Sequence, residues 1–241
     1  AEDEAQTSGQ LTIFDFPKGA TAGTAIHKLF EDESFEFSSA QSHDHNSAIE
    51  EILEEYQFDN KWTPVLQKML RDVSGCTIPN FHLSELSFVD ERREMEFYFP
   101  ASSADGNQLL EIIRNGSGVT NFEAAGDRFM TGFIDLVARQ DGKYMIIDYK
   151  SNYLGDTPDD YSQENLKREI ISASYDLQYH LYTVALVKYL RSKIADFDYS
   201  KHFAGVAYLF VRGMKAGSDT GVWFHKPEET VITELESILR R

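Results

Sequence analysis

The clearest pattern in the chain is a pair of apolar runs on either side of a short polar turn. Residues 132–137 read Gly-Phe-Ile-Asp-Leu-Val, residues 144–150 read Tyr-Met-Ile-Ile-Asp-Tyr-Lys, and Gln-Asp-Gly-Lys occupies 140–143 between them. An Asp-Gly pair between two apolar runs is a strong signal for a β-hairpin, here with a two-residue turn at Asp141 and Gly142. The pattern therefore predicts two antiparallel strands in a defined register.

That register brings two carboxylates together. Counting outward from the turn, Gln140 faces Lys143 and Asp135 falls opposite Asp148. Opposed residues have Cβ atoms roughly 4.5–5.5 Å apart, and Lys150, two residues past Asp148, lies on the same face. Two such charges cannot both ionise cheaply in a partly buried site, unless a divalent cation lies between them. The alternative, a solvated or salt-bridged surface cluster, is disfavoured by the apolar neighbours.

Elsewhere the pattern predicts helices alternating with a few strands, which is the α/β class. Helices are expected from a cap at Thr21 or Thr24, and over 49–56, 62–73, 109–113, 163–194 with a break near 172–174, and 228–241. Further strands are expected over 83–90, 93–99, 203–210 and 222–224, and loops over 41–46 and 116–127. The polar residues 1–19 are predicted to be a linker or tail, and 20–241 a single domain.

The amino-acid composition and the net charge limit the functions that the chain can have. The chain has 241 residues, of which 41% are hydrophobic, so it can bury a full core. Its net charge of −17 disfavours strong autonomous binding to a polyanion, because nonspecific nucleic-acid affinity comes mainly from Lys and Arg. An acidic domain can still cut nucleic acid if a metal supplies local positive charge and another polypeptide holds the substrate.

Several kinds of site are excluded or disfavoured. Cys76 is the one cysteine, so neither an internal disulfide nor a cysteine-held metal cluster is possible, and a reducing cytoplasm fits. No apolar run approaches the roughly 20 residues of a membrane span, and the acidic start does not read as a signal peptide. The phosphate-loop pattern for ATP and the Gly-x-Ser-x-Gly hydrolase pattern do not occur in the sequence.

Three stretches together carry a resemblance to a known family: residues 132–135, the Ile-Asp-Tyr-Lys-Ser-Asn run at 147–152, and Tyr-Asp-Leu-Gln-Tyr at 175–179. With them the chain resembles the nuclease domains of the RecB family, within the restriction-endonuclease-like PD-(D/E)xK superfamily. The likeness extends from 23–31 to 209–213. It implies a restriction-endonuclease-like core, a mixed β-sheet with a central hairpin flanked by α-helices.

The resemblance also implies roles for particular residues. Asp135 and Asp148 would ligate a metal, together with the backbone carbonyl of Tyr149. His27, in a His-Lys-Leu-Phe-Glu run, matches the metal-binding histidine, and Lys150 matches the catalytic lysine. Without the family likeness, His27 would be an ordinary histidine beside the apolar stripe of a helix. The Pro and first acid of the superfamily name are not adjacent here; Asp135 on the preceding strand takes that place, as in RecB-like members.

Other candidates are less sharply defined. An upstream glutamate is expected before the hairpin, and Glu94 is preferred while Glu96 stays open, since both lie on one face of the expected strand. Gln178 and Tyr179 match the Gln-Tyr motif of the family near its site. Gln178 and Tyr182 share a helix face, and without the resemblance they would be ordinary packing residues.

The implied reaction is metal-assisted hydrolysis of a phosphodiester bond in DNA. Mg²⁺ suits oxygen ligands with retained waters, Mn²⁺ is an alternative, and no iron–sulfur cluster or ATP site is expected. The implied partners are single-stranded DNA, a helicase part of the same subunit, other RecBCD-type subunits and a RecA-type recombinase, in the bacterial cytoplasm and away from membranes. A competing hypothesis is a nuclease-like docking module that recruits a recombinase to unwound DNA. The number of metal ions stays open.

Overall fold

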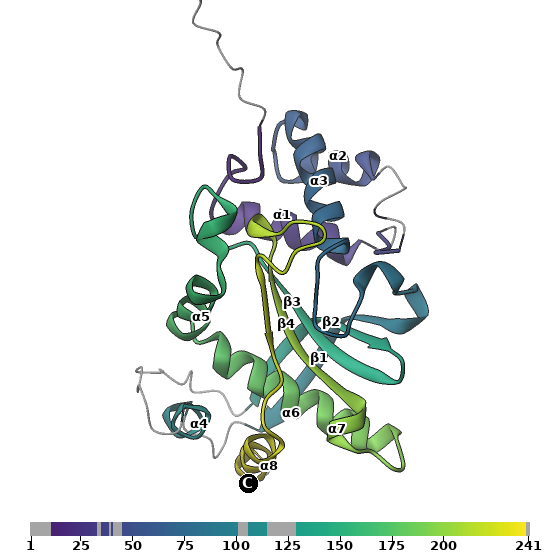
Figure 1. The fold of residues 1–241 in the computed structure, drawn as a ribbon, viewed down its shortest axis with the longest axis vertical. Coiled ribbons are helices and arrows are strands. Elements are labelled where there is room, and N and C mark those ends of the chain that lie inside the picture. The colour runs from purple at the N-terminus through teal and green to yellow at the C-terminus, as the bar shows by residue number, and fades with distance from the viewer. Residues whose placement is uncertain are drawn as a thin grey trace, which may run out of the picture.

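A mixed β-sheet forms the centre of the molecule (Figure 1). The computed structural model describes residues 11–32, 35–38, 40, 45–100, 106–114 and 129–239. The sheet has five strands in the order β1-β2-β3-β4-β5, with β3 and β4 parallel and the other neighbours antiparallel. The strands are β1 (Glu91–Pro100), β2 (Phe129–Gln140), β3 (Lys143–Lys150), β4 (Phe203–Phe210) and β5 (Val222–His225). The predicted α/β class and central hairpin are confirmed.

Helices cover both faces of this sheet. One buried cluster joins α1, α2 and α3 to one face, and a second joins α4 to α8 to the other. Figure 1 shows α6 crossing the sheet, with α1 to α3 at the opposite end of the molecule from α8. The helices are α1 (Ala20–Glu31), α2 (Asn46–Glu55), α3 (Thr63–Ser74), α4 (Gly106–Ile113), α5 (Gln163–Ser172), α6 (Tyr175–Lys193), α7 (Tyr199–His202) and α8 (Glu229–Leu239).

The β2–β3 hairpin has the predicted register. Asp141 and Gly142 form the turn with φ of 50° and 76°, the positive values that a two-residue type I′ turn requires. Pairing runs from Gln140 opposite Lys143 to Leu136 opposite Ile147. It stops there, one position before the two aspartates, so the strands begin to separate where the carboxylates lie.

Most other elements lie close to their predicted positions, including the break between α5 and α6, where Ser174 has a φ of 55°. The expected strand at 83–90 is wrong. Two 3₁₀ turns, Leu83–Glu85 and Phe88–Asp90, occupy that region, and the Ser87 hydroxyl donates to the Asp90 carboxylate at 2.7 Å. Such local side-chain bonds compete with a strand ladder.

The start of α1 also differs from the prediction. Neither threonine caps it: the helix begins after Gly19 without a side-chain cap, and the Thr24 hydroxyl donates to the Ala20 carbonyl within the helix. The expected loop at 116–127, residues 41–44 and the last two residues of the final helix lie outside the described residues. Among the described helices, none combines the length and apolar character needed to cross a membrane.

The segment before α1 packs on the domain. Phe16 has no exposed surface and contacts the rings of Phe58 and Trp62 at centroid distances of 5.3 and 5.4 Å. Although the polar composition of residues 1–19 predicts a tail, Phe16 within it is buried against the domain.

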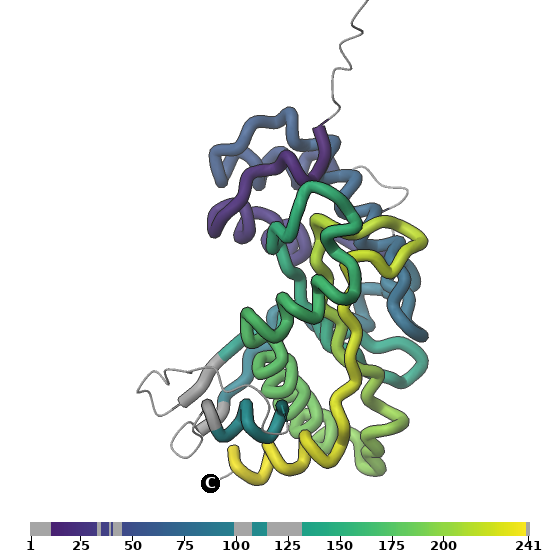
Figure 2. The backbone as a smooth tube through the Cα atoms, turned by 60° about the vertical axis from the view of Figure 1, so that its left-hand side comes forward, coloured from purple at the N-terminus to yellow at the C-terminus, as the bar shows by residue number. Residues whose placement is uncertain are grey.

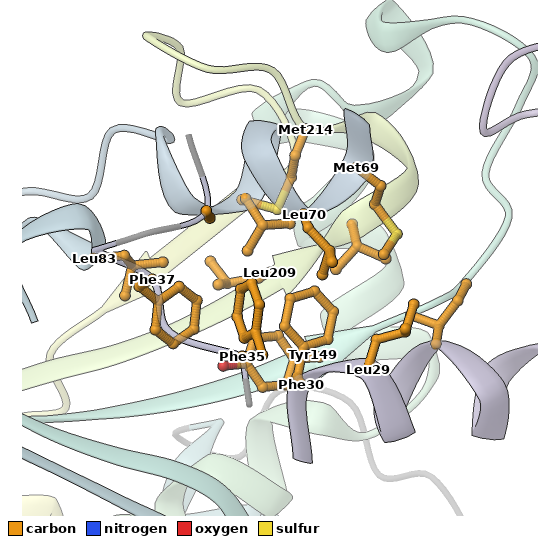
Figure 3. Close-up of a cluster of buried hydrophobic side chains, with 14 of the residues drawn as sticks. Leu29, Phe30, Phe35, Phe37, Met69, Leu70, Leu83, Tyr149, Leu209 and Met214 are labelled. Atoms are coloured by element: carbon orange, nitrogen blue, oxygen red, sulfur yellow. The ribbon is translucent and has the colours of Figure 1, made fainter. Parts of the chain in front are cut away.

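One hydrophobic cluster joins α1 to β3, and Figure 3 shows some of its side chains. The Phe30 ring of α1 stacks on Tyr149 of β3 with a centroid distance of 4.1 Å and an angle of 7° between planes. Leu29 joins them from α1, while Met69 and Leu70 approach from α3. Because Tyr149 lies between Asp148 and Lys150, this packing fixes the position of α1 relative to both.

Candidate active site

The first part of the site is the point where β2 and β3 separate. Asp135 there uses its side chain in place of a ladder partner: its Oδ2 atom accepts a hydrogen bond from the Tyr149 N–H at 2.9 Å. Asp148 is only 2% exposed, and the Asp135 carboxylate is close enough to raise the pKa of Asp148, although burial contributes more. The hairpin thus holds both acids together, as its register predicts.

Strand β1 contributes Glu94 through an irregular backbone. Arg93 pairs with Leu136 and Met95 with Ile134, but Glu94 between them, in register with Asp135, makes no ladder pair and has a φ of 49°. Left-handed backbone is uncommon for a residue with a side chain and is often found at functional sites. The charge of Glu94 is close enough to raise the pKa of Asp135, although burial contributes more.

Glu96 lies elsewhere. It pairs opposite Phe133, and its carboxylate is hydrogen-bonded to the hydroxyl of Tyr98. The structure therefore brings Glu94, and not Glu96, toward the aspartates.

Burial dominates the electrostatics of the two aspartates. It raises the pKa of Asp148 to about 7, and the Asp135 charge adds to this rise while the Lys150 ammonium opposes it. Burial also raises the pKa of Asp135, against the Tyr149 N–H that stabilises its anion. These raised pKa values favour a protonated form of the pair unless a cation replaces the proton.

Lys150 is held by four neighbours. It is 8% exposed, and its ammonium forms an ion pair with Asp148. It also donates to Gln178 Oε1 at 3.1 Å and lies 4.2 Å from the ring centroid of Tyr175 and 4.9 Å from that of Tyr208. Aromatic faces attract a buried ammonium, so these rings fix the position of its charge.

Gln178 of α6 connects this lysine to two tyrosines. Its Oε1 atom accepts a second hydrogen bond from the Tyr208 hydroxyl at 2.9 Å, and its Nε2 donates to the Tyr182 hydroxyl at 2.8 Å. Tyr179 is different: its ring packs against Tyr208 and His225 in the core, with centroids 6.0 and 5.5 Å away. Of the three predicted α6 residues, the structure brings Gln178 and Tyr182 to the site.

Two residues around the lysine are absent from the sequence prediction. Tyr208 lies directly beside Asp148 in the parallel β3–β4 pairing, a contact that spacing along the chain does not reveal. Tyr175 precedes Gln178 by three positions in α6, so shared helix spacing is the signal that could have placed it beside Lys150.

His27 reaches the site from α1. Its Nδ1 atom lies 3.5 Å from Asp135 Oδ2, and its ring lies edge-on to that of Tyr149 with the centroids 6.4 Å apart. Burial lowers the pKa of His27, although the Asp148 charge opposes this. A neutral imidazole is the form that binds a metal, so His27 is in the required state at neutral pH.

The donor chemistry fits a divalent cation. Asp148 Oδ1 is buried without a hydrogen bond of good geometry, although Lys150 pairs with it. Among the described residues, no group of three or more His, Cys, Asp or Glu side chains is arranged as a ready metal cage. Mg²⁺ does not require one, because it is commonly held by one or two carboxylates together with waters and substrate phosphates.

The buried aspartate predicts an unusual pH dependence of stability. The pKa of Asp148 in the folded chain, about 7, lies above its ordinary value of 3.8. The stability that its protonated form contributes is therefore complete below pH 3.8 and is lost as pH rises through 7. In a chelating buffer the loss reaches at most about 4 kcal/mol. Urea unfolding of wild type and Asp148→Asn between pH 4 and 8 measures it. Identical pH slopes for the two proteins would contradict the burial of an ionisable Asp148.

Comparison with known proteins completes the description of the site. The family model described as the PD-(D/E)XK nuclease superfamily matches residues 6–239. The chain belongs to this superfamily. PD-(D/E)XK nucleases use divalent metal ions, in agreement with the donor set formed by the hairpin acids.

Within this superfamily, the chain is similar to RecB subunits of the RecBCD enzyme. The chain is 40% identical over 237 residues to the RecBCD enzyme subunit RecB of Escherichia coli (strain K12), covering 95% of this chain and 20% of that protein. It is 36% identical to the subunit of the same name from Haemophilus influenzae, over 95% of this chain and 19% of that one. It is 29% identical to the RecBCD enzyme subunit RecB of Mycobacterium tuberculosis (strain ATCC 25618 / H37Rv), over 93% of this chain and 24% of that protein. The chain thus spans about a fifth of the length of these relatives.

Proposed function

We propose that this chain is the metal-dependent DNA nuclease domain of a RecBCD-type helicase–nuclease that processes double-strand DNA ends for recombinational repair. The observation that carries the proposal is the convergence of Asp135, Asp148 and Lys150 in one buried site. Similarity to RecB subunits supports the setting. We further propose that residues 20–241 form the nuclease domain and residues 1–19 lead into it, with the helicase elsewhere in the same subunit.

The side chains have separate tasks in this mechanism. Asp135 and Asp148 would hold the cation, with His27 and the carbonyl of Tyr149 beside them. When bound, a divalent cation lowers the pKa of a coordinated water and neutralises phosphate charge. Lys150, fixed by hydrogen bonding and aromatic contacts, presents its ammonium to the negative charge that develops on the phosphate.

Glu94 and the α6 residues support these groups. The Glu94 carboxylate adds negative charge beside Asp135 and would help to hold the cation directly or through water. Gln178 orients Lys150, and Tyr182 orients Gln178. Tyr179 would act only through packing with Tyr208.

Oxygen donors and a single imidazole favour Mg²⁺, with Mn²⁺ as a substitute. A cysteine-held iron–sulfur cluster does not fit, because Cys76 is the one cysteine of the chain and its thiol is buried. Burial raises the pKa of that thiol to about 12, so the thiolate needed for metal ligation is disfavoured.

A docking role for the acidic surface is compatible with this activity. The net charge of −17 suits a basic surface on a protein partner better than bare DNA, and the partners that we propose are a RecA-type recombinase and other RecBCD-type subunits. A docking module alone has no need for a buried and a half-buried carboxylate beside a lysine, so catalysis is the primary function.

Cleavage of linear and circular single-stranded DNA tests the proposal. The purified chain is expected to degrade linear DNA with Mg²⁺ or Mn²⁺ and to lose this activity in EDTA. Cleavage of the circle would establish endonuclease action. Failure of both substrates to be cut under any divalent metal would remove the catalytic assignment.

We also expect the isolated chain to bind DNA weakly and salt to suppress cleavage steeply. With a net charge of −17 it has few phosphate contacts to offer beyond the metal, and the remaining attraction is screened by salt. Fluorescence anisotropy of labelled single-stranded DNA, titrated from 50 to 200 mM salt, measures this. Tight binding in EDTA at physiological salt would show that the domain holds its own substrate.

A further inference from the structure

Arg212 is a buried charge without an acidic partner among the described residues. It lies in the turn after β4 and is 1% exposed. Its guanidinium makes four hydrogen bonds, all to backbone carbonyls. Nε donates to Ser151 at 2.9 Å, Nη1 to Ile13 at 2.9 Å and Phe16 at 3.0 Å, and Nη2 to Pro17 at 2.6 Å. Burying a charge is costly unless such bonds compensate it, so this arrangement demands that all four acceptors stay in place.

The acceptors belong to two segments that carry the site. Three carbonyls come from residues 13–17, here called the strap, which runs directly into α1 and hence to His27. The fourth is that of Ser151, the residue after Lys150. Figure 2 shows the start of the described chain beside the turn that follows β3. One side chain thus joins the beginning of α1 to the end of the catalytic strand.

A second contact closes the same connection. Gly23 of α1 packs against Ser151 so closely that a Cβ atom added at Gly23 would lie 2.9 Å from Ser151 Oγ. Gly23 precedes His27 by one helical turn, so the two lie on the same face of α1. The Ser151 carbonyl therefore accepts a hydrogen bond from Arg212, while the Ser151 side chain faces α1.

We propose that Arg212 is a positioning residue of the nuclease site, which sets the distance between His27 on α1 and the carboxylates on the hairpin. The expected effect of Arg212 on catalysis rests on the proposed function. The connection that Arg212 makes between α1 and the end of β3 does not depend on that function. Lysine cannot replace the arginine, because a single ammonium lacks the planar fork that reaches four carbonyls in two segments.

The main test compares Arg212→Lys with Arg191→Lys, a matched control in which the exchanged arginine pairs with Glu236 between α6 and α8. For Arg212→Lys, we expect Mn²⁺ affinity measured by calorimetry to fall roughly tenfold and kcat roughly 10- to 100-fold, the usual range for residues that orient metal ligands. KM for an oligonucleotide should stay within about twofold, because Arg212 does not touch substrate. The control should keep wild-type metal affinity and kcat.

A pair of small substitutions tests the coupling without touching Arg212. Gly23→Ala places a methyl group against Ser151 Oγ and should also weaken Mn²⁺ binding. Adding Ser151→Ala removes that oxygen, and the nearest Ser151 atom is then its Cβ at 4.0 Å. The double variant should therefore regain wild-type affinity, whereas Ser151→Ala alone should change nothing.

The His27 imidazole gives a readout independent of metal and activity. Its ¹⁵N resonances should move in Arg212→Lys and Gly23→Ala but not in Arg191→Lys. If the resonances move in these two variants while the wild-type chain neither binds Mn²⁺ nor cuts DNA, the positioning role is supported and the proposed function is removed. Wild-type resonances, kcat and metal affinity in a folded Arg212→Lys protein would overturn the inference, whatever the change in melting temperature. The same holds if Ser151→Ala fails to rescue Gly23→Ala.

Discussion

Replacing Asp148 by asparagine is expected to abolish metal-dependent cleavage, with a loss of roughly a thousandfold or more, as for other principal catalytic groups. Asp148 is the most buried acid of the site and lies beside both Asp135 and Lys150. An amide has the same shape but no charge to attract a cation. Single-turnover cleavage of a labelled oligonucleotide in saturating Mg²⁺ measures the loss.

The same substitution should preserve or raise the free energy of unfolding in EDTA. It removes one of two repelling carboxyl groups, and Lys150 keeps its contacts with Gln178 and Tyr175. Asp198→Asn is a matched control, because Asp198 caps α7 away from the site, and it should keep wild-type cleavage. Undiminished cleavage by Asp148→Asn would remove Asp148 from the active site.

His27→Ala should have a smaller effect on the same measurements. The imidazole is 3.5 Å from Asp135 and adds a neutral donor, whereas the carboxylates supply the charge that attracts the cation. We expect a raised Mg²⁺ requirement that excess metal overcomes. A complete loss of cleavage at saturating metal would instead give His27 a role in the chemical step.

The hairpin could be predicted from sequence because its signals are local. Alternation has a period of two and the Asp-Gly turn sets the register, so Asp135 and Asp148 follow from counting. The confirmed pairing from Gln140–Lys143 to Leu136–Ile147 rests on those signals. Long helices such as α6 are equally local, since their apolar positions recur over many turns.

Other parts of the site depend on contacts that no local pattern records. Tyr208 meets Lys150 because β4 lies parallel to β3, although the helices α5, α6 and α7 separate the two strands in the sequence. Arg212 meets the strap across nearly the whole chain. Glu94 could be named as a candidate, but strand alternation places Glu94 and Glu96 on one face and left Glu96 open. The structure separates them, because Glu94 has a positive φ and leaves the ladder while Glu96 pairs opposite Phe133. The Gln-Tyr motif points to two neighbours of which only Gln178 bonds to Lys150.

The second large effect is expected from Lys150→Met, which should slow cleavage roughly 10²- to 10³-fold, the usual loss when a charge-stabilising group is removed. Methionine preserves the apolar stem against Tyr175 and Tyr208 but leaves no cation beside Asp148. Because the carboxylates remain, Mn²⁺ affinity measured by calorimetry should change far less than the cleavage rate. That separation identifies Lys150 as a group acting on phosphate.

Two further variants sharpen the test. Lys150→Arg keeps the charge and should retain part of the activity, since its larger head does not match the space between Gln178 and the two rings. Lys201→Met removes an exposed lysine that pairs with Asp198 and should behave as wild type. If Lys150→Met lost metal binding and cleavage in equal measure, the lysine would be acting through Asp148, by lowering the pKa of that buried acid, and the ammonium would have no separate role at the phosphate.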